Sequence, residues 1–475
     1  MSPRGIRPRL ASLFARKGPD AEGGPSQAVP GGRIADRIGS SAAVIVGNLF
    51  GGQLLRLAGN LVLSRILFPE AFGLMTLVTA VIVGVTMFSD VGIKPSIQQS
   101  KRGDDQVFLD TAWTIQILRS FALWIACCLL SWPAGQFFNE PMLTQLLPVA
   151  SFSLVVMGFF PTREDTASRH LKIGRVMAID LVSQALGLVV IIGLAWWLRS
   201  VWAMAFGMVI GAVIKLVLYD LLLPGPRNRL CWEREARIEL IHFGKWIFLS
   251  TAFSFLLSQS DKMILGKFIT LEGIGIYNVG FFIAAAPMMI ATSMNGRIML
   301  PLCRDHPPGK SATDFALVRR VRVRFTMAFL ACQLALSLLG VTIIEILYDD
   351  RFHASGGVVV AVALMNIPFL IGMTYENAAM ASGDSRAVFA LNATRAILQT
   401  GLFLAGIQIG GLTGAFVGFA AGHLLAHAMV IRIAVKHGAW DPLHDAAMAL
   451  IGAGGAALAL WVHADDLALL AGFLS

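Results

Sequence analysis

Five basic side chains lie inside long apolar segments, where charge is costly, so they are the residues of this sequence best placed to do chemistry. They are Arg56, Arg119, Lys215, Lys262 and Arg395. A lone Arg or Lys at the centre of a lipid bilayer costs at least about 2.5–3.5 kcal/mol, so such a group usually faces a water-filled cavity or a partner. Cations on separate helices predict one shared cavity for an anion, and the planar fork of arginine suits phosphate oxygens. The alternative is pairing with acidic neighbours within one half of the protein.

Two acidic residues in similar segments are candidates for ion coupling. Glu376 follows Tyr375 in an otherwise apolar segment and is the first candidate. Asp261 is the second, although it stands beside Lys262 and the two charges could simply neutralise each other. These carboxylates are therefore expected either to bind a coupling ion or to form structural pairs.

The sequence offers no metal site and no catalytic centre. His423 and His427 share one helix face, but the sequence HLLAH lacks the glutamate of a zinc-protease motif, so packed or hydrogen-bonded imidazoles are expected. Neither a GxSxG nor a Walker A motif is present. We therefore predict that the protein is not an enzyme and uses no cofactor.

The elements that position these groups must be membrane-spanning helices. Hydrophobic residues make up 56% of the 475 residues and the mean hydropathy is +0.70. Charged residues are only 14%, against about 25% in soluble domains. This composition excludes a soluble enzyme, a disordered scaffold and a nucleic-acid-binding module, despite a net charge of +9. Continuous apolar runs predict spanning helices, not barrel strands, at 41–65, 71–93, 111–133, 142–161, 177–198, 202–223, 245–266, 273–296, 325–347, 356–381, 387–408 and 412–434, with a further candidate at 445–463.

The distribution of Lys and Arg predicts the orientation of the chain. Basic residues crowd the N-terminal tail and the loops that follow every second span. The opposite loops carry only Arg65, Arg199, Lys267 and Arg351. Because Lys and Arg concentrate in cytoplasmic loops, the N-terminus is predicted to be cytoplasmic, and the excess positive charge faces anionic lipid headgroups.

An internal repeat divides the spans into two groups of six. Residues 64–77 (SRILFPEAFGLMTL) and 266–279 (GKFITLEGIGIYNV) align with a shift of 202, which pairs Gly73 with Gly275. Six spans return the chain to its starting side, so the two halves have the same orientation. Their pseudo-twofold axis is therefore expected along the membrane normal, as in alternating-access transporters.

The predicted fold is an all-α integral membrane protein of two six-helix lobes with one extra C-terminal hydrophobic helix. Its parts are a basic cytoplasmic tail (1–38), an N-lobe (39–223), a cytoplasmic linker (224–244), a C-lobe (245–434) and an extra hydrophobic segment (435–475). Glycines spaced four apart favour close packing within a lobe over dimerisation, in span six (Gly207, Gly211) and in span twelve (Gly414, Gly418, Gly422).

Four short segments carry a resemblance to a known family. They are LSRILFPEAFGLMTL (63–77), MFSDVGIKPSIQQS (87–100), SQSDKMILGKF (258–268) and EGIGIYNVG (272–280). The third holds a D-K-x-x-L-G element on Asp261, Lys262 and Gly266, and the fourth a G-x-Y element on Gly275 and Tyr277. With these elements the chain resembles the polysaccharide-transporter family of bacterial flippases. That family is related to Wzx-type O-unit flippases and exopolysaccharide exporters, in the superfamily that also holds the multidrug and toxin extrusion antiporters.

The resemblance implies a V-shaped pair of lobes around a central cavity lined by basic residues. It also implies a multi-pass protein of the bacterial inner membrane that moves undecaprenyl-diphosphate-linked oligosaccharides to the outer leaflet for lipopolysaccharide or exopolysaccharide biosynthesis. The expected partners are the lipid-linked oligosaccharide, the phospholipid bilayer, and a polysaccharide polymerase with its chain-length machinery. Nucleic acid is not an expected partner.

Two other functions stay open from the sequence. A drug or metabolite antiporter would need a carboxylate facing organic cations, which the basic excess disfavours. A membrane-embedded glycosyltransferase or polymerase would need a large outer loop with catalytic acids, and the predicted outer loops are short. Dye efflux and polysaccharide export discriminate between the antiporter and the flippase.

Overall fold

The computed structural model describes residues 31–89, 92–170, 173–244 and 247–470. Most of the predicted basic tail, residues 1–30, lies outside the described residues, and a helix already begins at Gly31. The N-terminal half contains α2 (Gly31–Ile66), α3 (Pro69–Phe88), α4 (Ile93–Gln99), α5 (Gln106–Phe138), α6 (Leu143–Gly158), α7 (Arg163–Arg169), α8 (Ile173–Leu198), α9 (Trp202–Leu222) and α10 (Arg234–Gly244).

The C-terminal half is also helical throughout its described length. It contains α11 (Ile247–Phe268), α12 (Leu271–Asp305), α13 (Ala312–Leu347), the 3-10 turn η2 (Asp350–Phe352), α14 (Ser355–Met365), α15 (Ile367–Gly372), α16 (Glu376–Ala381), α17 (Ser385–Lys436), α18 (Pro442–Val462) and α19 (Ala464–Leu469). α10 occupies the predicted linker, and α18 forms the thirteenth predicted segment.

Helix ends follow from ordinary capping chemistry. Pro69 opens α3, where its missing N–H is not needed. The side chains of Asp105, Thr270 and Asp384 accept backbone N–H bonds at the starts of α5, α12 and α17. Within α17 the backbone leaves helical geometry at Gly410 and Gly411, and Gly411 has a φ of +60°, which glycine tolerates. The chain reverses there, so α17 is a hairpin of the two spans predicted at 387–408 and 412–434.

Most of the long helices are apolar enough to cross a bilayer, although, in the part of the chain that the structure describes, α2 and α11 are not among those that qualify. Nine helices of the described residues qualify, or ten if α6 and α7, which meet at a bend of 61°, form one broken span. The helical membrane fold is therefore confirmed. One predicted span, 356–381, differs in detail because it is divided into α14, α15 and α16.

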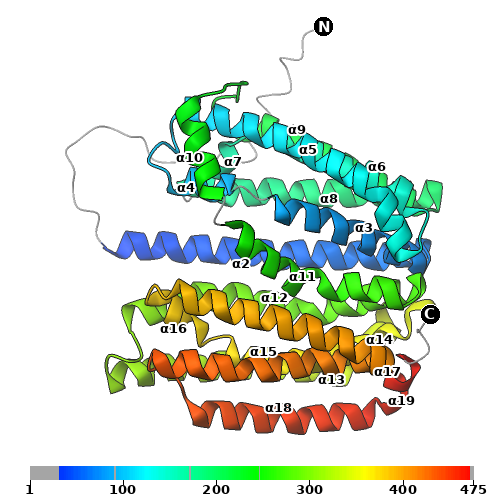
Figure 1. Cartoon of the computed structure of the whole chain (residues 1–475), viewed down its shortest axis with the longest axis vertical. Coiled ribbons are helices and arrows are strands. Elements are labelled where there is room, and N and C mark those ends of the chain that lie inside the picture. Colours follow the sequence, from blue (N-terminus) through cyan, green and yellow to red (C-terminus); the bar gives the residue numbers. More distant parts are fainter. Residues whose placement is uncertain (1–30, 90–91, 171–172, 245–246, 471–475) are drawn as a thin grey trace.

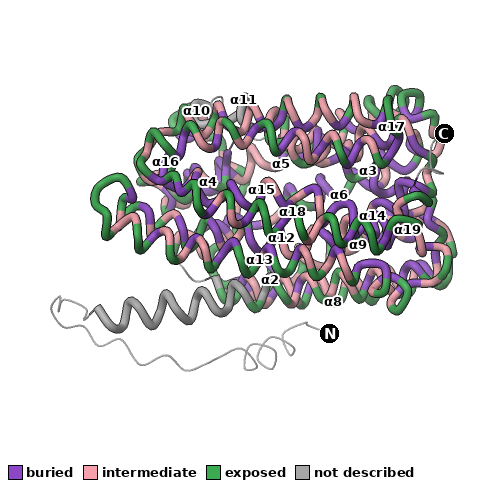
Figure 2. The backbone as a smooth tube through the Cα atoms, turned by 90° about the horizontal axis from the view of Figure 1, so that it is seen from below, coloured by how far each residue is buried: buried purple, intermediate pink, exposed green. Residues whose placement is uncertain are grey.

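The two halves of the chain form two stacked groups of helices (Figure 1). The N-terminal helices occupy one half of the view and α11 to α18 the other. We call the end that carries α4, α7, α10 and α16 the linker end, and the opposite end, where α14 and α19 lie, the crossing end. Exposed positions recur along the outer faces (Figure 2), and α8, α9 and α18 are the least buried of the spanning helices.

The predicted repeat is visible as a reciprocal contact between α3 and α12. A Cβ on Gly73 would overlap the carbonyl oxygen of Leu271, and a Cβ on Gly275 would overlap the carbonyl oxygen of Pro69. Pro69 and Leu271 are themselves related by the shift of 202. The same patch of each half therefore faces its counterpart, as in an isologous interface. The pseudo-twofold axis passes between the two glycines.

Glycines also let helices approach closely within each lobe. In α17, a Cβ on Gly414 or Gly418 would overlap carbonyl oxygens of the other arm of the hairpin, those of Gly406 and Leu402. In the N-terminal half, a Cβ on Gly207 would lie 2.6 Å from Ile191 on α8. The prediction of close packing inside a lobe is confirmed for Gly207, Gly414 and Gly418, whereas a Cβ on Gly211 would meet no atom of the described residues within 4 Å.

Candidate functional site

Arg56 lies on α2 with its side chain exposed. The glycines one turn to either side, Gly52 and Gly59, face α8, where a Cβ would meet the side chains of Gln184 and Leu188. Among the described residues Arg56 has neither an ion-pair nor a hydrogen-bond partner. In this part of the structure its guanidinium is uncommitted.

Arg119 lies on α5 and reaches the end of α3. Its Nη2 donates to the carbonyl oxygen of Thr86 at 3.0 Å, and its Nε and Nη2 both donate to Ser89 Oγ at 3.2 Å. α3 ends at Phe88, so Arg119 adds a charged donor to a carbonyl of the last turn and complements the negative end of the helix dipole.

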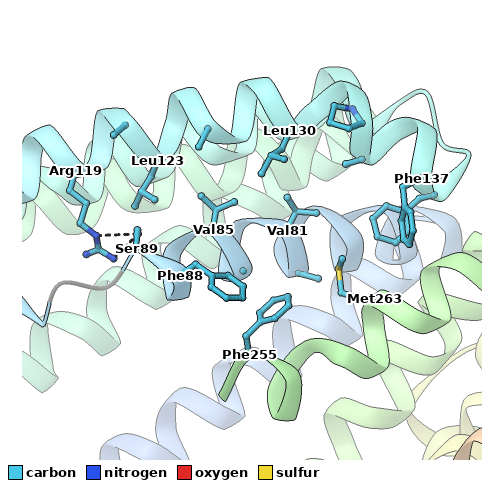
Figure 3. Close-up of a pocket in the computed structure, with 17 residues that line it drawn as sticks. Val81, Val85, Phe88, Ser89, Arg119, Leu123, Leu130, Phe137, Phe255 and Met263 are labelled. Atoms are coloured by element: carbon cyan, nitrogen blue, oxygen red, sulfur yellow. Dashed lines mark hydrogen bonds between the residues drawn. The ribbon is translucent and has the colours of Figure 1, made fainter. Parts of the chain in front are cut away.

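Arg119 also lies at one end of a cavity of about 650 Å³ between α3, α5 and α11 (Figure 3). Ser89 accompanies it there, and Phe137 marks the other end. The remaining lining side chains are aliphatic or aromatic, and the 18 residues from Arg119 to Phe137 correspond to about 27 Å of helix. Because α11 belongs to the C-terminal half, both lobes form this cavity. The other four predicted cations do not line it.

Lys215 is engaged within the N-terminal lobe. Its Nζ lies 2.9 Å from Asp180 Oδ1 on α8 and 5.5 and 5.2 Å from the ring centroids of Phe160 and Tyr219. The hydroxyl of Tyr219 donates to the same Asp180 oxygen at 2.8 Å. This cluster ties α8 to α9.

Asp261 and Lys262 on α11 form a cluster with α12. The hydroxyl of Tyr277 donates to Asp261 Oδ2 at 2.6 Å. Lys262 Nζ lies 3.7 Å from Asp261 Oδ1 and 5.0 Å from the ring centroid of Phe281. The D-K-x-x-L-G and G-x-Y elements, separate in the sequence, therefore meet in one hydrogen bond that sequence reasoning did not anticipate.

Arg395 on α17 is buried beside Glu376, the first residue of α16. Its Nη1 lies 2.9 Å from Glu376 Oε2, and its guanidinium carbon lies 4.9 Å from the ring centroid of Phe369. Next to Glu376, Asn377 Nδ2 donates to Asn295 Oδ1 at 3.1 Å. Glu376 therefore anchors the broken helix to the α17 hairpin.

The structure brings some of the predicted residues together and leaves others apart. Lys215, Lys262 and Arg395 each lie beside a carboxylate of their own lobe, which is the alternative that the sequence left open. Arg119 lines the cavity between the lobes, and Arg56 is exposed on α2. Substrate binding by these five residues stays a prediction.

Sequence reasoning missed a buried polar cluster at the linker end of the C-terminal lobe. It consists of Arg322, Tyr375, His427, His444 and Asp445. Two features of the sequence pointed toward it. His427 was expected to be hydrogen-bonded, which is confirmed, and the sequence DPLHD stands at the start of α18. The contact between these two segments could not be predicted, because it forms only when α18 packs against the rest of the lobe.

A second buried charge lies outside the spans, on α7. Asp165 Oδ1 is 3.5 Å from Lys94 Nζ, which also lies 3.0 Å from Glu164 Oε1. Burial raises the pKa of Asp165 to about 6, against the opposing attraction of Lys94. This carboxyl therefore changes its charge near physiological pH.

Sequence comparison identifies related proteins. Residues 62–355 match the family described as polysaccharide biosynthesis protein. The lipopolysaccharide biosynthesis protein WzxC of Escherichia coli (strain K12) is 21% identical over 370 residues, which is 77% of this chain and 73% of WzxC. The succinoglycan biosynthesis transport protein ExoT of Rhizobium meliloti (strain 1021) is 21% identical over 252 residues, which is 50% of this chain and 48% of ExoT.

Solved structures share the fold. The lipid II flippase MurJ in an inward closed conformation superposes with a TM-score of 0.64 at 11% identity, over 90% of this chain and 99% of MurJ. An inward-facing MATE family transporter of the MOP superfamily gives 0.51 at 15% identity, over 84% and 95%. The molecule thus has the two-lobed helical fold of these membrane transporters. Since the family match spans more than half of its residues, the chain belongs to the polysaccharide biosynthesis protein family, and the resemblance seen in its motifs is confirmed.

Proposed function

We propose that this protein is a flippase that moves undecaprenyl-diphosphate-linked oligosaccharide repeat units across the inner membrane for surface polysaccharide biosynthesis. The reciprocal contact of Gly73 and Gly275 carries this proposal, since it joins two similar lobes about one axis at one end of the bundle. Rocking of one such lobe against the other is how two-lobed transporters alternate their access. Family membership and the names of WzxC and ExoT support a role in polysaccharide biosynthesis, and the motif resemblance implies the lipid-linked repeat unit.

The linker end is then the cytoplasmic end, with the N-terminus inside. The diphosphate would bind Arg119 and Arg56 first, because Arg119 lies at one end of the cavity between the lobes and Arg56 has no partner among the described residues. The polyprenyl chain would stay in lipid, and the glycan would pass between the lobes. Arg395, Lys215 and Lys262 can join only by exchanging a carboxylate for the diphosphate.

Such an exchange offers a route to ion coupling. When the diphosphate takes Arg395, Glu376 loses its cation, and a buried carboxylate without a partner binds a proton or a metal cation more strongly. Asp261 is in the same position relative to Lys262, although the hydroxyl of Tyr277 still donates to it. Both carboxylates are engaged by donors here, which disfavours a site that displays a carboxylate to organic cations.

The decisive experiment is deletion of the gene followed by localisation of the lipid-linked oligosaccharide. We expect the intermediate to accumulate on the inner leaflet and surface polysaccharide to fall, with recovery when the wild-type gene is restored. The variant Arg119→Gln should restore neither, at normal membrane abundance. Unchanged surface polysaccharide together with reduced dye efflux would replace the flippase with an antiporter.

A further inference from the structure

The polar cluster beneath the first turn of α18 separates a buried cation from a buried anion. Arg322 on α13 is 1% exposed and its guanidinium carbon lies 4.1 Å from the ring centroid of Tyr375. The hydroxyl of Tyr375 donates to Asp445 Oδ1 at 2.7 Å. The ring of Tyr375 therefore lies between the guanidinium and the carboxylate, which form no direct ion pair within the described residues.

Two histidines are aimed at the same carboxylate. His444 Nδ1 lies 3.0 Å from Asp445 Oδ1, and His427 Nε2 lies 3.4 Å from Asp445 Oδ2. Because an ionised carboxylate only accepts, these ring nitrogens are assigned as N–H donors. Each neutral imidazole then keeps its second nitrogen as a base.

The two basic nitrogens have different surroundings. His444 Nε2 is buried, and no described residue makes a hydrogen bond to it. His427 Nδ1 lies beside Gly372 at the end of α15. A Cβ built on Gly372 would be only 2.9 Å from this nitrogen. The side chains of His427 and Asp445 are not fully enclosed, being 19% and 14% exposed.

The cluster holds one carboxylate beside two imidazoles. Asp441 is already paired, with Arg319 Nε 2.6 Å from its Oδ2. No Lys or Arg of the described residues lies within ion-pair distance of Asp445, whose ionisable partners among these residues are His427, His444 and Tyr375. An opposite charge at hydrogen-bond distance stabilises imidazolium, and a buried carboxylate without a cation is costly.

We propose that His427, His444 and Asp445 form a proton-binding site at the linker end of the C-terminal lobe. The ionisable groups that face it are Arg319 and Arg322 from α13, Tyr375 before α16 and Asp441 before α18, while α15 contributes only the backbone at Gly372. A proton taken from the water at the linker end adds to the free ring nitrogen, and the carboxylate balances the new charge. No further reactant is needed.

Binding of that proton would be communicated through the broken helix. Tyr375 and Glu376 are consecutive, and they tie the break between α15 and α16 to Asp445 and to Arg395. Imidazolium groups compete with Tyr375 for Asp445, so protonation loosens the tyrosine and with it the geometry of the Glu376–Arg395 pair. Only this consequence rests on the proposed function, because proton binding itself needs no substrate.

The test is a pH jump on the full-length protein in proteoliposomes on a solid-supported membrane, with no glycolipid present. Wild-type protein is expected to displace charge as the pH is lowered, with a measurable half-point, because histidine is the side chain best suited to bind a proton near neutral pH. The double variant His427→Gln/His444→Gln, which keeps amide donors, should lose this signal. The control His463→Gln should keep it, because His463 pairs with Asp466 at the other end of α18, 3.1 Å apart.

A second, more conservative variant distinguishes loss of proton binding from misfolding. Tyr375→Phe keeps the ring over Arg322 and removes the hydroxyl, so it should shift the half-point while retaining the displaced charge. An undiminished signal in the double variant, or loss of the signal in Glu376→Gln alone, would overturn the proposal and leave the cluster as an anchor for α18. Failure of the flippase function would leave these currents unchanged.

Discussion

Arg395 is buried against Glu376, and variants of this pair distinguish a structural from a transport role for the most buried of the five predicted cations. Removing one partner of a buried ion pair leaves an uncompensated charge and costs about 3–5 kcal/mol, whereas replacing both by apolar residues is often neutral. We expect Arg395→Met to lower the thermal unfolding temperature in detergent and Arg395→Met/Glu376→Met to restore it. The unfolding temperature of both variants is the measurement.

The double variant then reports on function. If the pair takes part in transport, the double variant is folded but exports no polysaccharide. Export at the wild-type level by the folded double variant would assign both residues to structure.

Asp165 provides a pH dependence that is independent of transport. Its pKa is raised to about 6 by burial, so the protonated acid is favoured in the folded state. That stabilisation is complete below the ordinary value of 3.8 and is lost as the pH rises through about 6. We expect Asp165→Asn to stabilise the protein above pH 6, by about 3 kcal/mol at most, and to have no effect below pH 4.

Thermal unfolding between pH 4 and 8 measures this effect. The exposed carboxylate of Asp305, which pairs with Arg304, gives the control Asp305→Asn. A gain that is equal at all pH values would contradict a buried, titrating Asp165.

At the scale of elements, the crossing of α3 and α12 leaves no room for a side chain. We expect Gly73→Ala to destabilise the protein by about 1–3 kcal/mol, the usual cost of overpacking, and to reduce export. Gly401→Ala on α17 is the matched control, because no atom lies within 4 Å of its Cβ position and alanine favours the helix. Equal stability of the two variants would show that the crossing opens readily.

The elements show which features of this molecule could be predicted from the sequence. Apolar runs of spanning length predicted the helices, and the repeat of residues 64–77 at 266–279 predicted the symmetry. Both signals can be read from short stretches of sequence without knowledge of tertiary contacts. The break of the tenth span into α14, α15 and α16 could not be predicted, because the side chains of Tyr375 and Asn377 bind partners on α18 and α12, which are distant in the sequence. Likewise, own-lobe pairs such as Lys215 with Asp180 depend on how α8 meets α9.

At the scale of the whole molecule, two of the rare cations predicted on the outer side bridge the lobes. Arg351 Nη2 donates to the carbonyl oxygen of Ser64 at 2.9 Å, and Lys267 Nζ donates to that of Phe137 at 2.8 Å. Hydrogen bonds from charged donors contribute about 1.5–3 kcal/mol each. We expect Arg351→Gln/Lys267→Gln to shift the protein toward an open crossing end, which hydrogen exchange of segments 64–77 and 266–279 would detect as faster labelling.

Arg199→Gln is the control for this shift. Arg199 is also predicted on the outer side, but its side chain is exposed at the loop between α8 and α9. Faster exchange in the control, or unchanged exchange in the double variant, would mean that the two bridging bonds do not hold the lobes together.

The reciprocal glycine crossing has a consequence for the origin of the chain. Each half supplies one glycine and one carbonyl oxygen to this interface, and the residues from the two halves occupy equivalent positions in the repeat. A free first half would offer a second copy of itself the same docking patch. The covalent protein therefore has the geometry that duplication and fusion of a homodimer leaves behind, and co-expressed halves should reassemble without the peptide that joins them.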